Sequence, residues 1–121
     1  MISNLIVRCT VTTTELPTPV VGYCRYEGYP FIKFTKNLKD ASFFGSGVTI
    51  EKADEDNAIH HMRLLPEKDV VKNYFVAWLK EVGLPAMKIL YKLELVKMEG
   101  PSLEQLTVTV VDTLEGVKEV A

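Results

Sequence analysis

The chain has 121 residues, of which 47% are hydrophobic and 25% are charged, a composition typical of a folded globular protein rather than a disordered one. Its formal net charge of −2 excludes a general electrostatic attraction to polyanions, which requires a surplus of lysine and arginine. No apolar run approaches the roughly 20 residues of a membrane-spanning helix, and no signal-peptide pattern opens the chain. We therefore expect a soluble, cytoplasmic protein with a single domain over residues 1–121 and no membrane partner.

The first part of the chain predicts three strands. Residues 2–14 alternate between apolar and polar side chains, which indicates a half-buried strand with one apolar face made of Leu5, Val7, Cys9 and Val11. Two prolines in residues 15–19 predict a loop. Residues 20–26 and 31–36 are rich in β-branched and aromatic side chains and are separated by turn-forming residues, so we expect them to form a hairpin.

The middle of the chain predicts a second hairpin. Residues 43–52 alternate again, with two glycines that suggest a bulge or a close neighbour. Residues 54–57 form an acidic, polar cluster of the kind found in turns. We expect residues 58–65 to follow as the partner strand of this hairpin.

The clearest helix signal begins at Pro66, because proline is tolerated in a first helical turn and Glu67 and Asp69 favour the positive end of the helix dipole. Gly83 provides a C-terminal cap. Between them, apolar residues recur at spacings of three and four, which predicts a face buried against a sheet: Val71, Tyr74, Phe75, Trp78, Leu79 and Val82.

The C-terminal part predicts a third hairpin, made of strands over residues 87–98 and 106–110. The tail, residues 113–121, fits either a frayed helical turn or an edge strand. Together these elements predict an α+β fold, in which a curved, mostly antiparallel sheet of about six or seven strands packs on one central amphipathic helix.

Aromatic and basic residues interleave in the first hairpin. Four basic side chains lie between residues 23 and 39 against the single acid Glu27, and five aromatic rings accompany them. Aromatic rings stack on planar ligands and neighbouring cations neutralise phosphate, so this hairpin is a candidate site for an anionic or planar small ligand. The candidate ligand-binding residues are Tyr23, Arg25, Lys33 and Lys36. The alternative is an ordinary exposed hairpin, in which aromatics and lysines are common.

The remaining titratable residues do not form a pattern typical of catalysis or metal binding. His60 and His61 are adjacent on a predicted strand and would point to opposite faces, with His60 inward. Cys9 and Cys24 lack a metal-ligand spacing, and we expect reduced thiols, with a disulfide as the alternative if their strands are neighbours. The acidic residues 54–56 lack a calcium-loop pattern. We assign no catalytic residue, no metal ligand and no cofactor.

The function that we expect is a binding or assembly module without catalytic chemistry, because no nucleophile, base and orienting group can be assembled from the spacing. Two alternatives stay open. One is a small enzyme or small-molecule pocket that uses a tyrosine or His61 with a carboxylate. The other is a binder of single-stranded nucleic acid or nucleotides through residues 20–36, against which the overall negative charge argues.

The C-terminal hairpin also predicts association between copies of the chain. Leu90, Val96 and Met98 lie out of register with its main apolar alternation, and Val111 lies beside threonines, so neither face is cleanly polar. One helix cannot cover both faces, and leftover apolar surface is typical of an interface. We expect a homo-oligomer, most simply a dimer, with residues 87–112 in or near its interface. The alternative is a hairpin that bends and buries both faces within one subunit.

Overall fold

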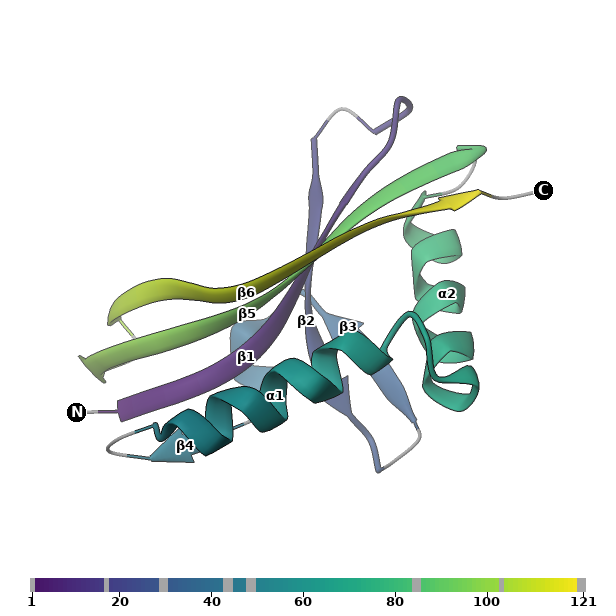
Figure 1. Ribbon diagram of the computed structural model, residues 1–121. Coiled ribbons are helices and arrows are strands. Elements are labelled where there is room, and N and C mark those ends of the chain that lie inside the picture. Colours follow the sequence, from purple (N-terminus) through teal and green to yellow (C-terminus); the bar gives the residue numbers. More distant parts are fainter. Residues whose placement is uncertain are drawn as a thin grey trace.

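The computed structural model describes residues 2–16, 18–28, 31–42, 45–47, 50–83, 86–102 and 104–119. Six strands, two α-helices and one short 3-10 helix follow one another within these residues (Figure 1). In chain order they are β1 (Ile2–Thr12), β2 (Val20–Tyr26), β3 (Ile32–Thr35), η1 (Leu38–Asp40), β4 (Gly45–Gly47), α1 (Lys52–Leu64), α2 (Asp69–Gly83), β5 (Lys88–Ser102) and β6 (Gln105–Glu119).

The sheet is antiparallel, and its main path runs β3-β2-β1-β5-β6. β5 pairs with the whole of β1, from Ile2 opposite Gly100 to Thr12 opposite Leu90. The other edge of β1 is shared, because β4 pairs with its first half and β2 with its second half. The sheet is strongly twisted, so that β2 and β3 run steeply across the direction of β5 and β6 (Figure 1).

The α+β class is confirmed, but the expected number and arrangement of elements is wrong. The main path has five strands rather than six or seven, with the short β4 attached beside it, and two helices rather than one central helix cover the sheet. The hairpin made of β2 and β3 and the C-terminal hairpin made of β5 and β6 are confirmed. The described part of the tail is strand, since β6 continues to Glu119.

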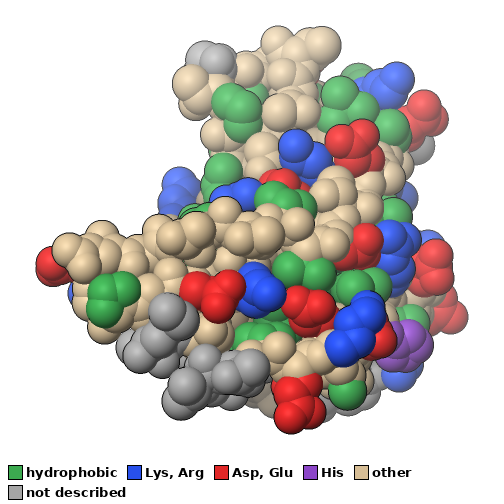
Figure 2. Space-filling view, turned by 60° about the vertical axis from the view of Figure 1, so that its left-hand side comes forward, with side chains coloured by type: hydrophobic (Ala, Val, Ile, Leu, Met, Phe, Trp, Pro, Cys, Tyr) green, Lys and Arg blue, Asp and Glu red, His purple; other side chains and the backbone are tan. Residues whose placement is uncertain are grey.

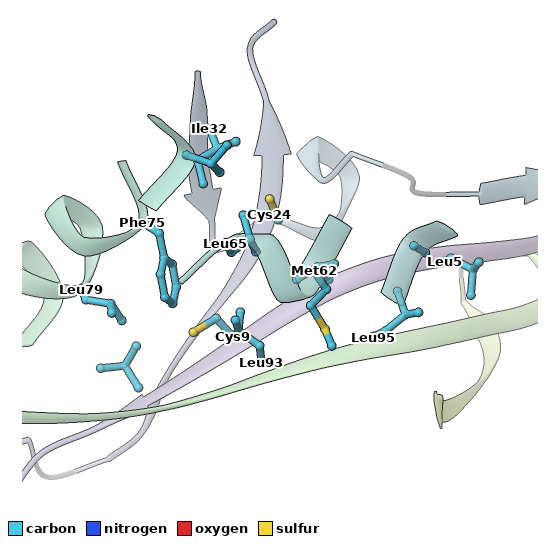
Figure 3. Packing of buried hydrophobic residues seen from close by; sticks show 14 of the residues in the cluster. Leu5, Cys9, Cys24, Ile32, Met62, Leu65, Phe75, Leu79, Leu93 and Leu95 are labelled. Atoms are coloured by element: carbon cyan, nitrogen blue, oxygen red, sulfur yellow. The ribbon is translucent and has the colours of Figure 1, made fainter. Parts of the chain in front are cut away.

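Both helices pack on the same face of the sheet. The predicted inner face of β1 is confirmed, because its four apolar side chains are fully buried in the main core. Figure 3 shows Met62 of α1 and Phe75 of α2 reaching toward Cys9 of β1 and Leu93 of β5. α1 contacts β1, β4, β5 and β6, whereas α2 contacts β3, β1 and β5. The two helices therefore cover different parts of this face.

Helix α1 corrects two expectations, the acidic turn at residues 54–57 and the strand at residues 58–65. A capping box begins the helix: the Glu51 side chain accepts from the backbone of Asp54, and the Asp54 side chain accepts from the backbone N–H of Glu51. The inward residues are Ala58, Met62 and Leu65, spaced four and three apart, and all three are buried. The acidic cluster is therefore the first turn of a helix, where negative charge is favoured.

Two sets of ion pairs join α1 to the C-terminal hairpin. The Arg63 guanidinium donates two hydrogen bonds to the Asp112 carboxylate, each 3.0 Å long. Near the other end of the helix, the Lys97 ammonium lies 3.3 Å from Glu55. A two-pronged Arg–carboxylate contact fixes direction as well as distance, so these pairs orient α1 along the strands.

Helix α2 confirms the expected helix up to Gly83, although it begins at Asp69. Val71, Phe75 and Leu79 are buried, as predicted. The burial expected for Tyr74 is wrong, since 36% of this residue is exposed and its ring meets Phe31 edge to face. Trp78 is only half-buried, with its ring stacked on Phe34 at a centroid distance of 4.4 Å.

A glycine in β2 makes room for Trp78. A Cβ atom at Gly22 would lie 2.7 Å from the Trp78 ring, closer than real Cβ contacts allow. The indole therefore rests directly on the backbone of β2.

Among the described residues, no helix is long and apolar enough to cross a membrane.

Truncating Phe75 should weaken the packing of α2 on the sheet, because this buried ring contacts the rings of both Phe34 and Tyr91. We expect Phe75→Ala to lower the free energy of unfolding by about 3–5 kcal/mol. The exposed Lys72→Ala on the same helix is the control and should change it by less than about 0.5 kcal/mol. Urea unfolding monitored by Trp78 fluorescence measures both values, and equal values would contradict this packing.

Candidate functional site

The sheet face opposite α1 and α2, hereafter the open face, carries the exposed apolar side chains of the C-terminal hairpin. The pairing register places Thr12, Leu90 and Val117 side by side in one row across β1, β5 and β6. Leu90 is 45% exposed and Val117 is 51% exposed. These two side chains form a cross-strand apolar pair that the chain itself leaves uncovered.

A hollow of about 470 Å³ lies along this row. Its walls combine apolar groups with hydroxyl and charged side chains, contributed by Thr10, Thr12, Leu90, Tyr91, Lys92, Glu115, Gly116 and Val117. Lys92 and Glu115 are cross-strand partners, so a basic and an acidic side chain adjoin the apolar pair. The hollow therefore carries no strong net charge of either sign.

A smaller core covers the middle of the open face. Ile6, Val96 and Met98 are buried there, and the residues that pack against them include Leu38 of η1 and Ala41 just after it. Val96, one of the residues expected at an interface, is thus buried within the chain. Val111, another, is half-buried against the main core, whereas Leu90 is exposed.

A partly buried ion pair separates this smaller core from the hollow. Arg8 and Glu94 face each other across β1 and β5, with the guanidinium 3.2 Å from the carboxylate. Glu94 is buried, so Arg8 balances a charge that would otherwise be costly to desolvate. Beyond the smaller core, Val108 and Val110 of β6 are again exposed.

Three of the four predicted ligand-binding residues lie on the open face, at its other edge. Arg25 lies opposite Lys33 in the pairing of β2 with β3, and Tyr23 lies two residue pairs further along, on the same face. Tyr23 packs against the smaller core. Lys36 follows β3 and lines a separate hollow of about 460 Å³, to which Phe34 and Trp78 also contribute.

Glu27 already pairs with two of these basic residues. Its carboxylate lies 2.7 Å from the Lys33 ammonium and 3.2 Å from the Arg25 Nε. The Arg25 guanidinium also donates to the backbone carbonyl of Asp40 at 2.9 Å. The hydrogen bond and charge of Lys33, followed by the charge of Arg25, lower the pKa of Glu27 below its ordinary value. A ligand anion at this site would have to compete with a carboxylate that stays ionised.

The surface charge is mixed in sign. Figure 2 shows acidic and basic side chains next to one another across the face that it presents, rather than gathered into a patch of one sign. The ion pairs of Lys97 with Glu55 and of Arg63 with Asp112 are examples of this arrangement. The observed pattern gives no support to a continuous track for a nucleic-acid backbone on the face shown.

The histidines lie on α1 and not on a strand. His60 and His61 are both exposed, with ring centroids 5.9 Å apart, so the inward position expected for His60 is wrong. The residues that the structure describes contain no group of three or more His, Cys, Asp and Glu side chains able to hold a metal ion.

The two cysteines are buried, free thiols on the neighbouring strands β1 and β2. Cys9 lies opposite Gly22 rather than opposite Cys24. Burial raises the pKa of Cys24 to about 12 and raises that of Cys9 as well, with the nearby Cys24 adding to the effect on Cys9. Both sulfurs are therefore held in the protonated, weakly nucleophilic form.

The hollow was not predicted from the sequence. Its row of residues depends on how β5 and β6 align with β1, and alternation within one strand does not fix that alignment. The signal that did point to this region was the presence of apolar residues, such as Leu90, on the second face of the hairpin. The comparisons with protein families, curated proteins and solved structures found no match to this chain.

Anion binding at the first hairpin stays a prediction, and the pairing with Glu27 gives it a sharp test. If Arg25 and Lys33 bind a phosphate group, Glu27→Gln should raise the affinity for inorganic triphosphate roughly three- to fivefold at low salt by removing a competing carboxylate. Glu115→Gln makes the same charge change on β6 and should have no such effect. Isothermal titration calorimetry checks both variants, and absence of triphosphate binding to all forms would contradict the assignment of Tyr23, Arg25, Lys33 and Lys36.

Proposed function

We propose that this protein is an assembly module, which associates with a second copy of itself through the C-terminal hairpin and has no catalytic chemistry of its own. The observation that carries the proposal is the one-sided covering of the sheet. Four large apolar side chains are exposed on β5 and β6: Leu90, Val108, Val110 and Val117. The pairing register places all four on the open face, away from the helices.

Single exposed apolar residues are normal on a protein surface, but several on two adjacent strands are typical of an interaction site. The two α-helices cannot cover these side chains, because both helices lie on the opposite face. The short η1 segment covers only the middle of the open face, over Ile6 and Val96. A second subunit would complete the covering, and symmetric dimers are the commonest assembly of soluble chains.

A small-molecule site is the second candidate, and the hollow beside Leu90 and Val117 is the observation that favours it. Its volume of about 470 Å³ falls within the range of small-ligand pockets. Hydroxyl groups of Thr10 and Thr12 and the charges of Lys92 and Glu115 could orient a ligand. We place assembly first, because the exposed Val108 and Val110 lie outside this hollow and a small ligand would leave them uncovered.

Solution mass tests the proposal directly. At a concentration of tens of micromolar, sedimentation equilibrium should give twice the chain mass of 13.6 kDa. Val110→Lys should shift the protein to the single-chain mass, because it would bury an unpaired charge in the interface. Val70→Lys is a matched control on α2, since Val70 is 47% exposed and Val110 is 46% exposed, and this variant should keep the double mass. A wild-type protein that sediments as a single chain at these concentrations contradicts assembly.

A further inference from the structure

The outer strand β6 has one edge without a strand partner among the described residues. β6 is 15 residues long and ends the strand order of the sheet, with β5 on its inner side. An unpaired strand edge presents backbone N–H and C=O groups that can pair with another chain, and proteins commonly block such edges with charge or proline. How β6 is blocked, or left open, differs between its two halves.

The first half of β6 carries no blocking residue. Residues 105–111 contain no charged side chain, no proline and no glycine. Within this stretch, Thr107 to Val110 pair with β5 in a regular ladder, from Glu99 to Val96, and a register shift flanks this ladder on each side. The second half, in contrast, carries Asp112, Glu115, Lys118 and Glu119.

The first half of β6 is also self-complementary. In an antiparallel pairing of two copies centred on Val108, Val108 lies opposite its own counterpart and Thr107 lies opposite Thr109. In the same register, Leu106 lies opposite Val110, so apolar side chains meet on the open face and threonines meet on the other. Cross-strand pairs of these types stabilise a sheet, and a two-fold interface requires this kind of self-matching.

Other registers oppose unfavourable partners. A pairing centred on Glu115 places two glutamates face to face, and one centred on Val117 places Glu115 opposite Glu119. A pairing centred on Thr109 places Leu106 opposite Asp112, so that an apolar side chain meets a charge. Like charges directly opposite destabilise a pair of strands, so charge and pattern together select Val108 as the centre.

We propose that two copies of this chain join edge to edge through β6, in the antiparallel register centred on Val108, so that their sheets form one continuous sheet. This inference rests on the proposed assembly function and specifies its contact. Leu106, Val108 and Val110 of both copies then form one apolar cluster on the joined open faces. In this cluster Val108 and Val110, each 46% exposed in the single chain, lie beside apolar side chains of the second copy.

Engineered cysteines test the register. In the proposed register, the Cα atoms of the two copies of residue 108 lie about 5 Å apart. Mild oxidation of Val108→Cys should therefore link most of the protein as a covalent dimer. Val117→Cys is the control on the same strand, and the register separates its two copies by more than about 50 Å. The native thiols contribute little background, because Cys9 and Cys24 are buried and protonated.

A mixing experiment supplies a second readout. Thr107→Cys and Thr109→Cys should each cross-link weakly alone, because like positions are about 8 Å apart, and should cross-link efficiently when mixed, because they lie opposite each other. A double-mass protein in which neither Val108→Cys nor the mixture cross-links overturns the edge pairing and leaves assembly standing. A single-mass protein without cross-links overturns both.

Discussion

The pairing of β1 with β5 is the constraint on which the rest of the structure depends. β1 is apolar on one face from Leu5 to Val11, and it lies in the middle of the strand order, with β2 and β4 along one edge and β5 along the other. A slip of one residue in this ladder would turn Arg8 into the helix-covered core and Leu5 toward the open face. In the observed register Arg8 lies opposite Glu94, and their ion pair adds a polar contact to a ladder held mainly by apolar burial.

From this ladder follow both the placement of the helices and the surface that they leave uncovered. Met62, Phe75 and Leu79 pack on the apolar face of β1 and β5 and make that face the main core. The Arg63–Asp112 contact then fixes α1 against β6. With both helices on one side, the other side must be covered by η1, by solvent or by another molecule. Among the described residues, Leu90 of β5 and the exposed valines of β6 are large apolar side chains that stay uncovered on that face.

Sequence patterns predicted the elements whose periodicity is strong. The alternation in β1 and the three- and four-residue spacing in α2 decided those elements correctly. α1 was missed because its sequence is rich in charge and has few inward apolar residues, with Ala58 too small to mark a face. The capping pair of Glu51 and Asp54 was the available signal, but it uses acids in place of the usual Ser or Thr.

The candidate site was harder to predict, because it depends on contacts between strands that are distant in sequence. The pattern brought Tyr23, Arg25 and Lys33 to one region correctly, since they share one hairpin. It did not show that Glu27 would form ion pairs with Arg25 and Lys33, because these pairs depend on the conformations of the side chains. The apolar surplus on the C-terminal hairpin was visible in the sequence, but which residues stay exposed was decided by η1 and by the bulge beside Val96.

The central claim is that a buried β1–β5 ladder supports the outer strand β6, whose free edge pairs with a second copy of the chain. Hydrogen exchange at each backbone amide, measured at increasing protein concentration, tests this claim. Amides of β1 should exchange most slowly at every concentration, because they open only on global unfolding. The outward amides of residues 105–111 should exchange fast in dilute protein and become protected as the concentration rises. Protection of these amides that does not change with concentration, or exchange in β1 as fast as in β6, would contradict the account.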